Sequence, residues 1–229
     1  MDMRISGSGK IPAGEYNNIS SSGSVQLYGR VRCKSFRSSG SSRGEDIECS
    51  ESFKSSGSAS FKENIKAKNI RVSGSLFCKG DIFAEGKLSC SGSAKCEKRI
   101  KCEELSVSGS LYVGDGITAE NVNLSGGADC GGLLNAENIT IKADKLMNIG
   151  SIGGTNILLK RKKFSIHAKR GVKVASSIEG DNIVLDSVTC PRVTGRTVVI
   201  GKGCKIDLVQ YSEQFTAFRG AKIGRIEKI

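Results

Sequence analysis

Histidine, proline, tryptophan and long apolar runs are scarce or missing in this sequence of 229 residues. The single histidine, His167, has no specified partner for acid or base catalysis, and no phosphate-binding glycine loop is present. No run of 18 apolar residues exists, which excludes a membrane-spanning helix. Aromatic residues make up only 5% and show no base-stacking pattern. These absences argue against an enzyme, a bound cofactor, a small-molecule substrate and specific nucleic-acid recognition.

The nine cysteines are predicted to be buried, reduced thiols rather than disulfides or metal ligands. Most of them occupy positions where the repeat described below points inward, and a buried free thiol behaves as a small hydrophobe. No pair has the spacing of a zinc site, so we expect no metal; a disulfide set is the weaker alternative. The first five residues do not resemble a signal peptide. The odd cysteine count and this start both predict a reducing cytoplasm.

The sequence is rich in Ser-Gly pairs that recur on a nearly constant period. The glycines are Gly7, Gly23, Gly40, Gly57, Gly74, Gly92, Gly109 and Gly126, with spacings of 16, 17, 17, 17, 18, 17 and 17. A period near 17 is too short for helical repeats. It suits one turn of a β-solenoid, in which each turn packs only on its neighbours.

Columns of equivalent residues support this interpretation. Apolar residues alternate by two in three short runs per repeat, which is typical of strands with one buried face. One column holds Val31, Ile47, Ile65, Ile82, Ile100, Ile117 and Leu134; the small column two residues further on holds Cys33, Cys49, Ala67, Ala84, Cys102, Ala119 and Ala136. A third column begins with Phe36 and Phe53. We predict an all-β fold: a single parallel β-solenoid domain over 1–229, with three short strands per coil and about 17 residues per coil.

Serines flank each glycine on both sides in the first half, and we expect them to form two outward ladders on a solvated surface. After Gly126 the repeat continues without these serines. A longer interval contains Lys160, Arg161, Lys162 and Lys163, and it predicts a basic inserted loop near 160–172. The net charge of +12 favours an anionic partner, such as an acidic protein or a lipid surface, although a simply solvated surface explains it equally well.

The chain resembles the bactofilins, bacterial polymer-forming cytoskeletal proteins, and is most similar to the longer, tail-less type of Gram-positive bacteria. The resemblance rests on residues 5–9, 13–16, 131–136, 149–154, 178–183 and 199–211. It implies a right-handed parallel β-helix that assembles without nucleotide into filaments that support cell shape, polarity or motility. It also implies that the partner is a second copy of the chain or a paralogue.

Assembly is expected to use the terminal coils, because their outer strands leave backbone groups unpaired. At the C-terminal end, the ladder is expected to finish at Val209 and Tyr211, with Phe215 and Phe218 forming a cap or a polymer contact. At the N-terminal end, Ile5, Ile11 and Ile19 are the predicted facing surface.

The alternative function is a soluble adaptor solenoid that binds an acidic partner or a membrane surface through its basic face without polymerising, with Lys160, Arg161, Lys162 and Lys163 as the expected contact. The expected location is the cytoplasm, with or without association with the membrane. A left-handed acyltransferase solenoid fits poorly, because the hexapeptide spacing is not kept. An ice- or carbohydrate-binding solenoid fits poorly as well, because the ladders contain serine instead of threonine or aromatic residues.

Overall fold

The computed structural model describes residues 1–162 and 171–229. It divides into two compact units, Met1–Gly114 and Asp115–Ile229. Each unit is a parallel β-solenoid with a repeat of about 17 residues, and no helix occurs among the described residues. The predicted all-β solenoid is therefore confirmed, while the single domain over 1–229 stays a prediction.

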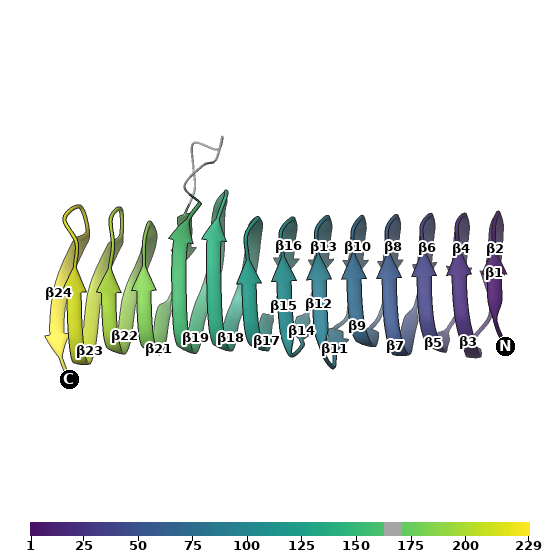
Figure 1. Ribbon diagram of the computed structural model, residues 1–229, viewed down its shortest axis with the longest axis horizontal. Coiled ribbons are helices and arrows are strands. Elements are labelled where there is room, and N and C mark those ends of the chain that lie inside the picture. The colour runs from purple at the N-terminus through teal and green to yellow at the C-terminus, as the bar shows by residue number, and fades with distance from the viewer. Residues whose placement is uncertain (163–170) are drawn as a thin grey trace. The chain divides into compact units, whose positions relative to one another are not determined.

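Unit 1 is made of short strands that pair with the equivalent strands of the turns before and after (Figure 1). They are β1 (Met3–Ile5), β2 (Ser8–Ile11), β3 (Gly14–Ser21), β4 (Ser24–Leu27), β5 (Arg30–Ser38), β6 (Ser41–Gly44), β7 (Asp46–Ser55), β8 (Ser58–Phe61), β9 (Ile65–Val72), β10 (Ser75–Cys78), β11 (Ile82–Ala84), β12 (Lys87–Cys90), β13 (Ser93–Cys96), β14 (Arg99–Lys101), β15 (Glu104–Val107) and β16 (Ser110–Val113).

Unit 2 contains longer strands that bend around more than one side of the solenoid. They are β17 (Gly116–Leu124), β18 (Gly127–Ala143), β19 (Leu146–Arg161), β20 (Gly171–Val174), β21 (Ser177–Leu185), β22 (Val188–Ile200), β23 (Lys205–Ala217) and β24 (Lys222–Lys228).

Each turn of unit 1 has three sides, as predicted. In one turn the sides are three separate strands, β10, β11 and β12. In the preceding turn β9 covers two sides, because it pairs with β11 through Ile65 and with β12 through Ile70. Whether a turn shows two or three strands depends only on whether the chain remains extended through the corner between the second and third sides.

The core consists of the inward columns predicted from the sequence. Val31, Ile47 and Ile65 stand in register and are fully buried. The small column runs from Cys33 through Cys49 and Ala67 to Ala84. A third column contains Phe36 and Phe53, whose rings stack with centroids 5.2 Å apart, and Phe61 meets Phe53 edge-on at 5.7 Å. Such aromatic pairs stabilise beyond the area they bury.

The repeated glycines mark a corner where successive turns touch backbone to backbone. A Cβ built on Gly40, Gly57 or Gly74 would overlap the carbonyl oxygen of the corresponding glycine one repeat earlier. The first member of the column, Gly7, has no earlier turn beside it, and a Cβ there meets nothing within 4 Å. The flanking serines are exposed, and Ser58, Ser75, Ser93 and Ser110 stand in direct register. The corner thus requires glycine for steric reasons.

Unit 2 contains a ladder of asparagine side chains. Asn138 donates to Asn121 at 3.0 Å, Asn156 to Asn138 at 2.8 Å, and Asn182 to Asn156 at 2.9 Å. Each interior member both donates and accepts one amide hydrogen bond, so the amides are linked along the stack. The ladder therefore links neighbouring turns through residues that are 17 to 26 positions apart in the sequence.

Candidate assembly surfaces

At the N-terminal edge of unit 1 the outer strands lack backbone partners, but side chains cover the core. Among the described strands, β1 pairs with β3 alone and β2 with β4 alone, so both leave their outer edge unpaired. A Cβ on Gly9 would lie 2.9 Å from the Ile5 side chain, so Ile5 occupies the space above Gly9. Ile11 and Ile19 are 0% and 1% exposed. The predicted facing surface is therefore corrected: Ile5 lies at this edge, whereas Ile11 and Ile19 belong to the core.

Tyr16 completes this N-terminal closure. It stands in register with Cys33 in the inward column, and its hydroxyl donates to the Pro12 carbonyl oxygen at 2.9 Å. Close by, the Asp2 carboxylate accepts hydrogen bonds from the backbone N–H and the side-chain amide of Asn18, at 3.1 and 3.2 Å. The first turn is therefore held in shape by its own side chains, and its strand edges remain available.

The C-terminal edge of unit 2 extends further than the sequence analysis expects. The ladder does not finish at Tyr211: β23 continues to Ala217, and β24 then pairs with residues 205–211 of β23. The rest of β23 pairs with β22 through Phe215, and no later described strand covers it. Polar residues such as Lys222 and Arg225 occupy β24, so its apolar alternation is too weak to reveal the strand in the sequence.

Apolar side chains gather at this uncovered edge. Phe215 lies in the inward column with Val198 yet remains half-buried, and its ring stacks on Tyr211 at 5.4 Å. Phe218 is 55% exposed, and the exposed fractions of Ile226 and Ile229 are 49% and 64%. A core column that ends in partly exposed aromatic rings is expected where no further turn covers the last turn of a solenoid.

The predicted basic loop is shorter than 160–172. Lys160 and Arg161 belong to β19, where they pair with Lys142 and Ala143, and the chain after the gap resumes in β20 at Gly171. The side chains of residues 160–162 are exposed. Lys163 and His167 lie outside the described residues. The consecutive cations therefore start on a strand, since the backbone ladder continues through them.

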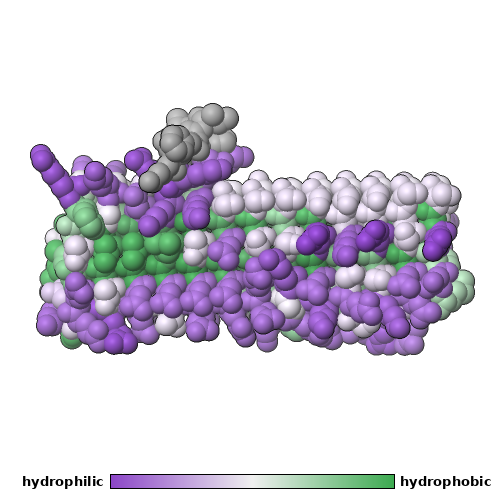
Figure 2. Space-filling view, in the orientation of Figure 1, coloured by the Kyte–Doolittle hydropathy of each residue, from purple (hydrophilic) through white to green (hydrophobic). Residues whose placement is uncertain are grey.

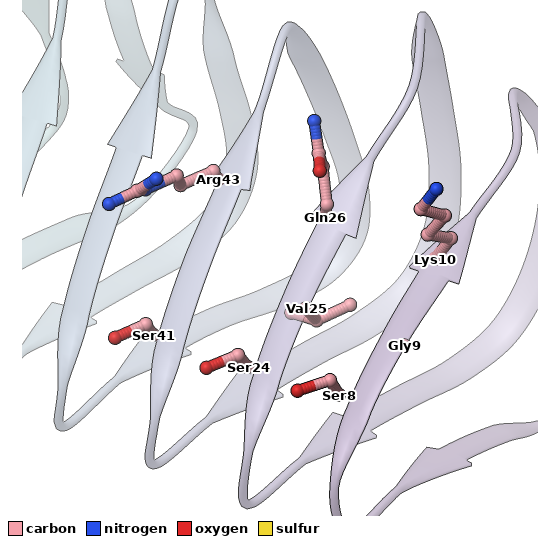
Figure 3. Close-up of a pocket in the computed structure, with 8 residues that line it drawn as sticks. All are labelled: Ser8, Gly9, Lys10, Ser24, Val25, Gln26, Ser41 and Arg43. Carbon is pink, nitrogen blue, oxygen red and sulfur yellow. The ribbon is translucent and has the colours of Figure 1, made fainter.

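A surface hollow of about 640 Å³ in unit 1 lies on β2, β4 and β6 (Figure 3). Ser8, Ser24 and Ser41 form one row of its lining, and Lys10 and Arg43 flank Gln26 in another. Figure 3 shows the three serine side chains pointing the same way from neighbouring strands. The lining contains no carboxylate, thiol or histidine, so it offers neither a general base nor an activated nucleophile.

Charged side chains on the second side of unit 1 alternate in sign. Arg32 lies 3.6 Å from Glu15 and 3.4 Å from Glu48, and Lys66 reaches Glu48 at 3.0 Å. The hydrogen bond from Lys66, with a further contribution from Arg32, lowers the pKa of Glu48. These exposed pairs fix the register of neighbouring turns more than they stabilise the fold.

All nine cysteines are free and buried, as predicted. Burial raises the pKa of Cys78 and Cys102 to about 12 and that of Cys190 to about 11. Cys33 and Cys49 lie with their sulfurs 3.5 Å apart, and the hydrogen bond with Cys33, together with burial, raises the pKa of Cys49. The thiols therefore act as core residues. The described residues contain no cluster of His, Cys, Asp or Glu that could hold a metal ion, and no helix that could span a membrane.

Each unit is a parallel β-solenoid, and the strands β1, β2 and β24 each have one edge without a partner among the described residues. Residues 65–152 match the Bactofilin family model, described as polymer-forming cytoskeletal. The uncharacterized protein YhbF of Bacillus subtilis (strain 168) is 36% identical over 81 residues, which is 35% of this chain and 34% of that protein. No solved structure matches the chain. The matched segment is therefore similar to the bactofilins, which confirms the predicted resemblance to that family.

Proposed function

We propose that this protein is a non-enzymatic cytoskeletal scaffold that assembles through its terminal coils into nucleotide-independent filaments. The observation that carries the proposal is the uncovered C-terminal edge, where Phe218 is 55% exposed and the Tyr211 and Phe215 rings stack on each other. A partner strand there would satisfy backbone groups and bury aromatic surface in one step. The bactofilin-like segment supports self-association, and the roles in cell shape, polarity or motility come from that resemblance.

The N-terminal edge is the proposed second contact. The free outer edges of β1 and β2 offer backbone donors and acceptors, and Ile5 and Met1 provide apolar surface, with Met1 74% exposed. A contact that repeats from subunit to subunit without closing on itself produces an open filament. A paralogue with the same edges could enter the same filament.

Phe218→Arg tests the C-terminal contact. The substitution places a charge on the exposed ring position, so we expect filaments to disappear from negative-stain electron micrographs while β-sheet circular dichroism and the melting temperature remain as in the wild type. Leu133→Arg is the matched control, because Leu133 is 47% exposed in the same unit but away from the open edge. Unaltered filaments in Phe218→Arg would place the contact elsewhere, and loss of the fold would make Phe218 an intramolecular cap.

The exposed cations Lys160, Arg161 and Lys162 are the proposed contact with an acidic protein or lipid surface at the start of the inserted segment. Each could add about 1 kcal/mol near an anionic bilayer. Sedimentation with phosphatidylglycerol vesicles would compare the wild type with a variant in which all three are glutamine. Equal binding would remove this segment from consideration.

A further inference from the structure

The third side of unit 1 stacks positive charges directly on one another. Arg37, Lys54 and Arg71 occupy the same outward position on three consecutive turns. In the same column, Ser20 precedes Arg37 and Arg4 precedes Ser20. We call Arg4, Arg37, Lys54 and Arg71 the basic ladder. Strand neighbours are about 4.8 Å apart, and like charges directly opposite each other destabilise a sheet.

The basic ladder has no neutralising partner within the described chain. None of its members makes an ion pair there, in contrast to other cations of unit 1. Arg30 pairs with Asp46 at 2.6 Å, and Lys66 with Glu48 at 3.0 Å. The ladder cations are exposed except for Lys54, which is half-buried. A column of unpaired like charges is held together by the surrounding fold, so a negatively charged ligand would relieve its repulsion.

A hollow in the ladder offers a place for one anionic group. The short side chain of Ser20 lies between Arg4 and Arg37 along the column, and the three residues line a cavity of about 490 Å³. Asp2 also lines it, and its carboxylate, which accepts two hydrogen bonds from the neutral Asn18, keeps its negative charge; the two guanidinium groups outnumber it. Two guanidinium groups and a hydroxyl are the donors that suit a phosphate.

The columns on either side of the ladder restrict the kind of ligand. One side carries Asn18, Ser35, Ser52 and Asn69 in register; the other carries the exposed corner serines Ser22, Ser39, Ser56 and Ser73. Figure 2 shows this side of unit 1 as a pale row along the corner above deep purple side chains. The strip presents cations, hydroxyls and amides, without an outward aromatic or apolar side chain. It therefore provides nothing for stacking bases or inserting into a bilayer.

We propose that the basic ladder binds a linear inorganic polyphosphate chain laid across the turns of unit 1, with one phosphate in the hollow at Ser20. A ligand that is phosphate along its whole length matches a strip in which four cations and neutral hydroxyl and amide groups stand against the single carboxylate of Asp2. This proposal does not depend on filament formation, because every residue it uses belongs to one chain.

Fluorescence anisotropy with labelled long-chain polyphosphate, measured over a range of salt concentrations, tests the proposal. We expect the Arg37→Gln, Lys54→Gln, Arg71→Gln variant to bind at least tenfold more weakly. For this variant, the slope of log affinity against log salt concentration should decrease in magnitude by about 2. Each contact with a single-stranded polyanion contributes about 0.7 to that slope, and three contacts are removed. The matched control is Arg30→Gln, Lys66→Gln, Arg99→Gln, which removes the same charge from ion-paired positions. An equal loss of affinity in both variants would mean that binding depends on net charge alone, and it would overturn the proposal.

Two further measurements separate binding from structure and from other ligands. Ser20→Asp places a carboxylate in the hollow and should abolish binding, whereas Ser93→Asp, on an exposed serine row, should not. The ladder variant should melt at or above the wild-type temperature, because it loses like-charge repulsion. A lower melting temperature would give the ladder a structural role instead. Tighter binding of oligothymidylate or phosphatidylglycerol vesicles than of polyphosphate would assign the surface to nucleic acid or membrane and overturn the proposal.

Discussion

Alanine at the corner glycines should destabilise the protein in a way that depends on the turn. A Cβ on Gly57 would overlap the carbonyl oxygen of Gly40 and lie 2.6 Å from that of Ser39. Carbon and oxygen normally approach to about 3.3 Å, so the two turns would have to separate by most of an ångström or more. The φ of Gly57 is not in the positive region, so the conformation itself suits alanine and the cost is steric.

The expected cost of Gly57→Ala combines two effects. Overpacking of this kind costs about 1–3 kcal/mol. The smaller conformational entropy of the unfolded alanine chain offsets about 0.4–1 kcal/mol of that. A net loss of about 1–2 kcal/mol corresponds to a melting temperature lowered by about 2–8 °C in a chain of this size.

Gly7→Ala is the matched control for this prediction. It occupies the same place in the repeat, yet a Cβ there meets nothing within 4 Å. Only the unfolded-state effect remains, so thermal denaturation followed by circular dichroism should show an unchanged or slightly higher melting temperature. Equal melting temperatures for the two variants would refute the argument that close stacking of turns selects glycine at this corner.

Two other predictions concern the asparagine ladder of unit 2 and the buried thiols. Asn156→Ala removes two hydrogen bonds of the asparagine ladder, and Asn182→Ala removes one. Chemical denaturation should therefore show a free energy of unfolding lower by about 1–3 kcal/mol for Asn156→Ala and by about 0.5–1.5 kcal/mol for Asn182→Ala. Equal losses would contradict a ladder of independent hydrogen bonds. The raised pKa values of Cys78, Cys102 and Cys190 mean that folding favours the neutral thiols, so their contribution is complete below the unfolded pKa near 8.5 and is lost as pH rises toward 11–12. The melting temperature should fall over this range, and less steeply when the three are alanine; identical slopes would exclude them as the cause.

The buried columns of the solenoid could be predicted, because burial requires apolar residues at regularly spaced positions. Apolar residues that alternate by two and recur every 17 or so positions place Ile47 on Val31 and Phe53 on Phe36, as the registers confirm. The same period, applied to outward positions, would have revealed the basic ladder, since Arg37, Lys54 and Arg71 are each 17 residues apart. Cations that are grouped by proximity along the chain do not show this alignment, because the members of the ladder stand one full turn apart.

The ends of the fold were harder to predict, because the period weakens there. β24 contributes only Ile223 and Ile226 as apolar residues, so nothing in its sequence marks a strand. The early position of Ile11 and Ile19 in the chain predicts that they face the N-terminal surface, but Ile5 and Tyr16 lie over the first turn and both isoleucines are buried. Lys160 and Arg161 extend β19, because backbone pairing does not require apolar side chains.

The near-identical corners of unit 1 make its length adjustable in units of one turn. Excision of residues 58–74 would leave Gly57 followed by Ser75, and β10 would then stack on β6 in the register that β8 now has. Ile82 would meet Ile47, and every class of contact across the new junction would already exist elsewhere in the unit. Duplication of the same segment would add a turn by the same reasoning. The length of unit 1 can therefore change in steps of one turn while neighbouring turns keep their register.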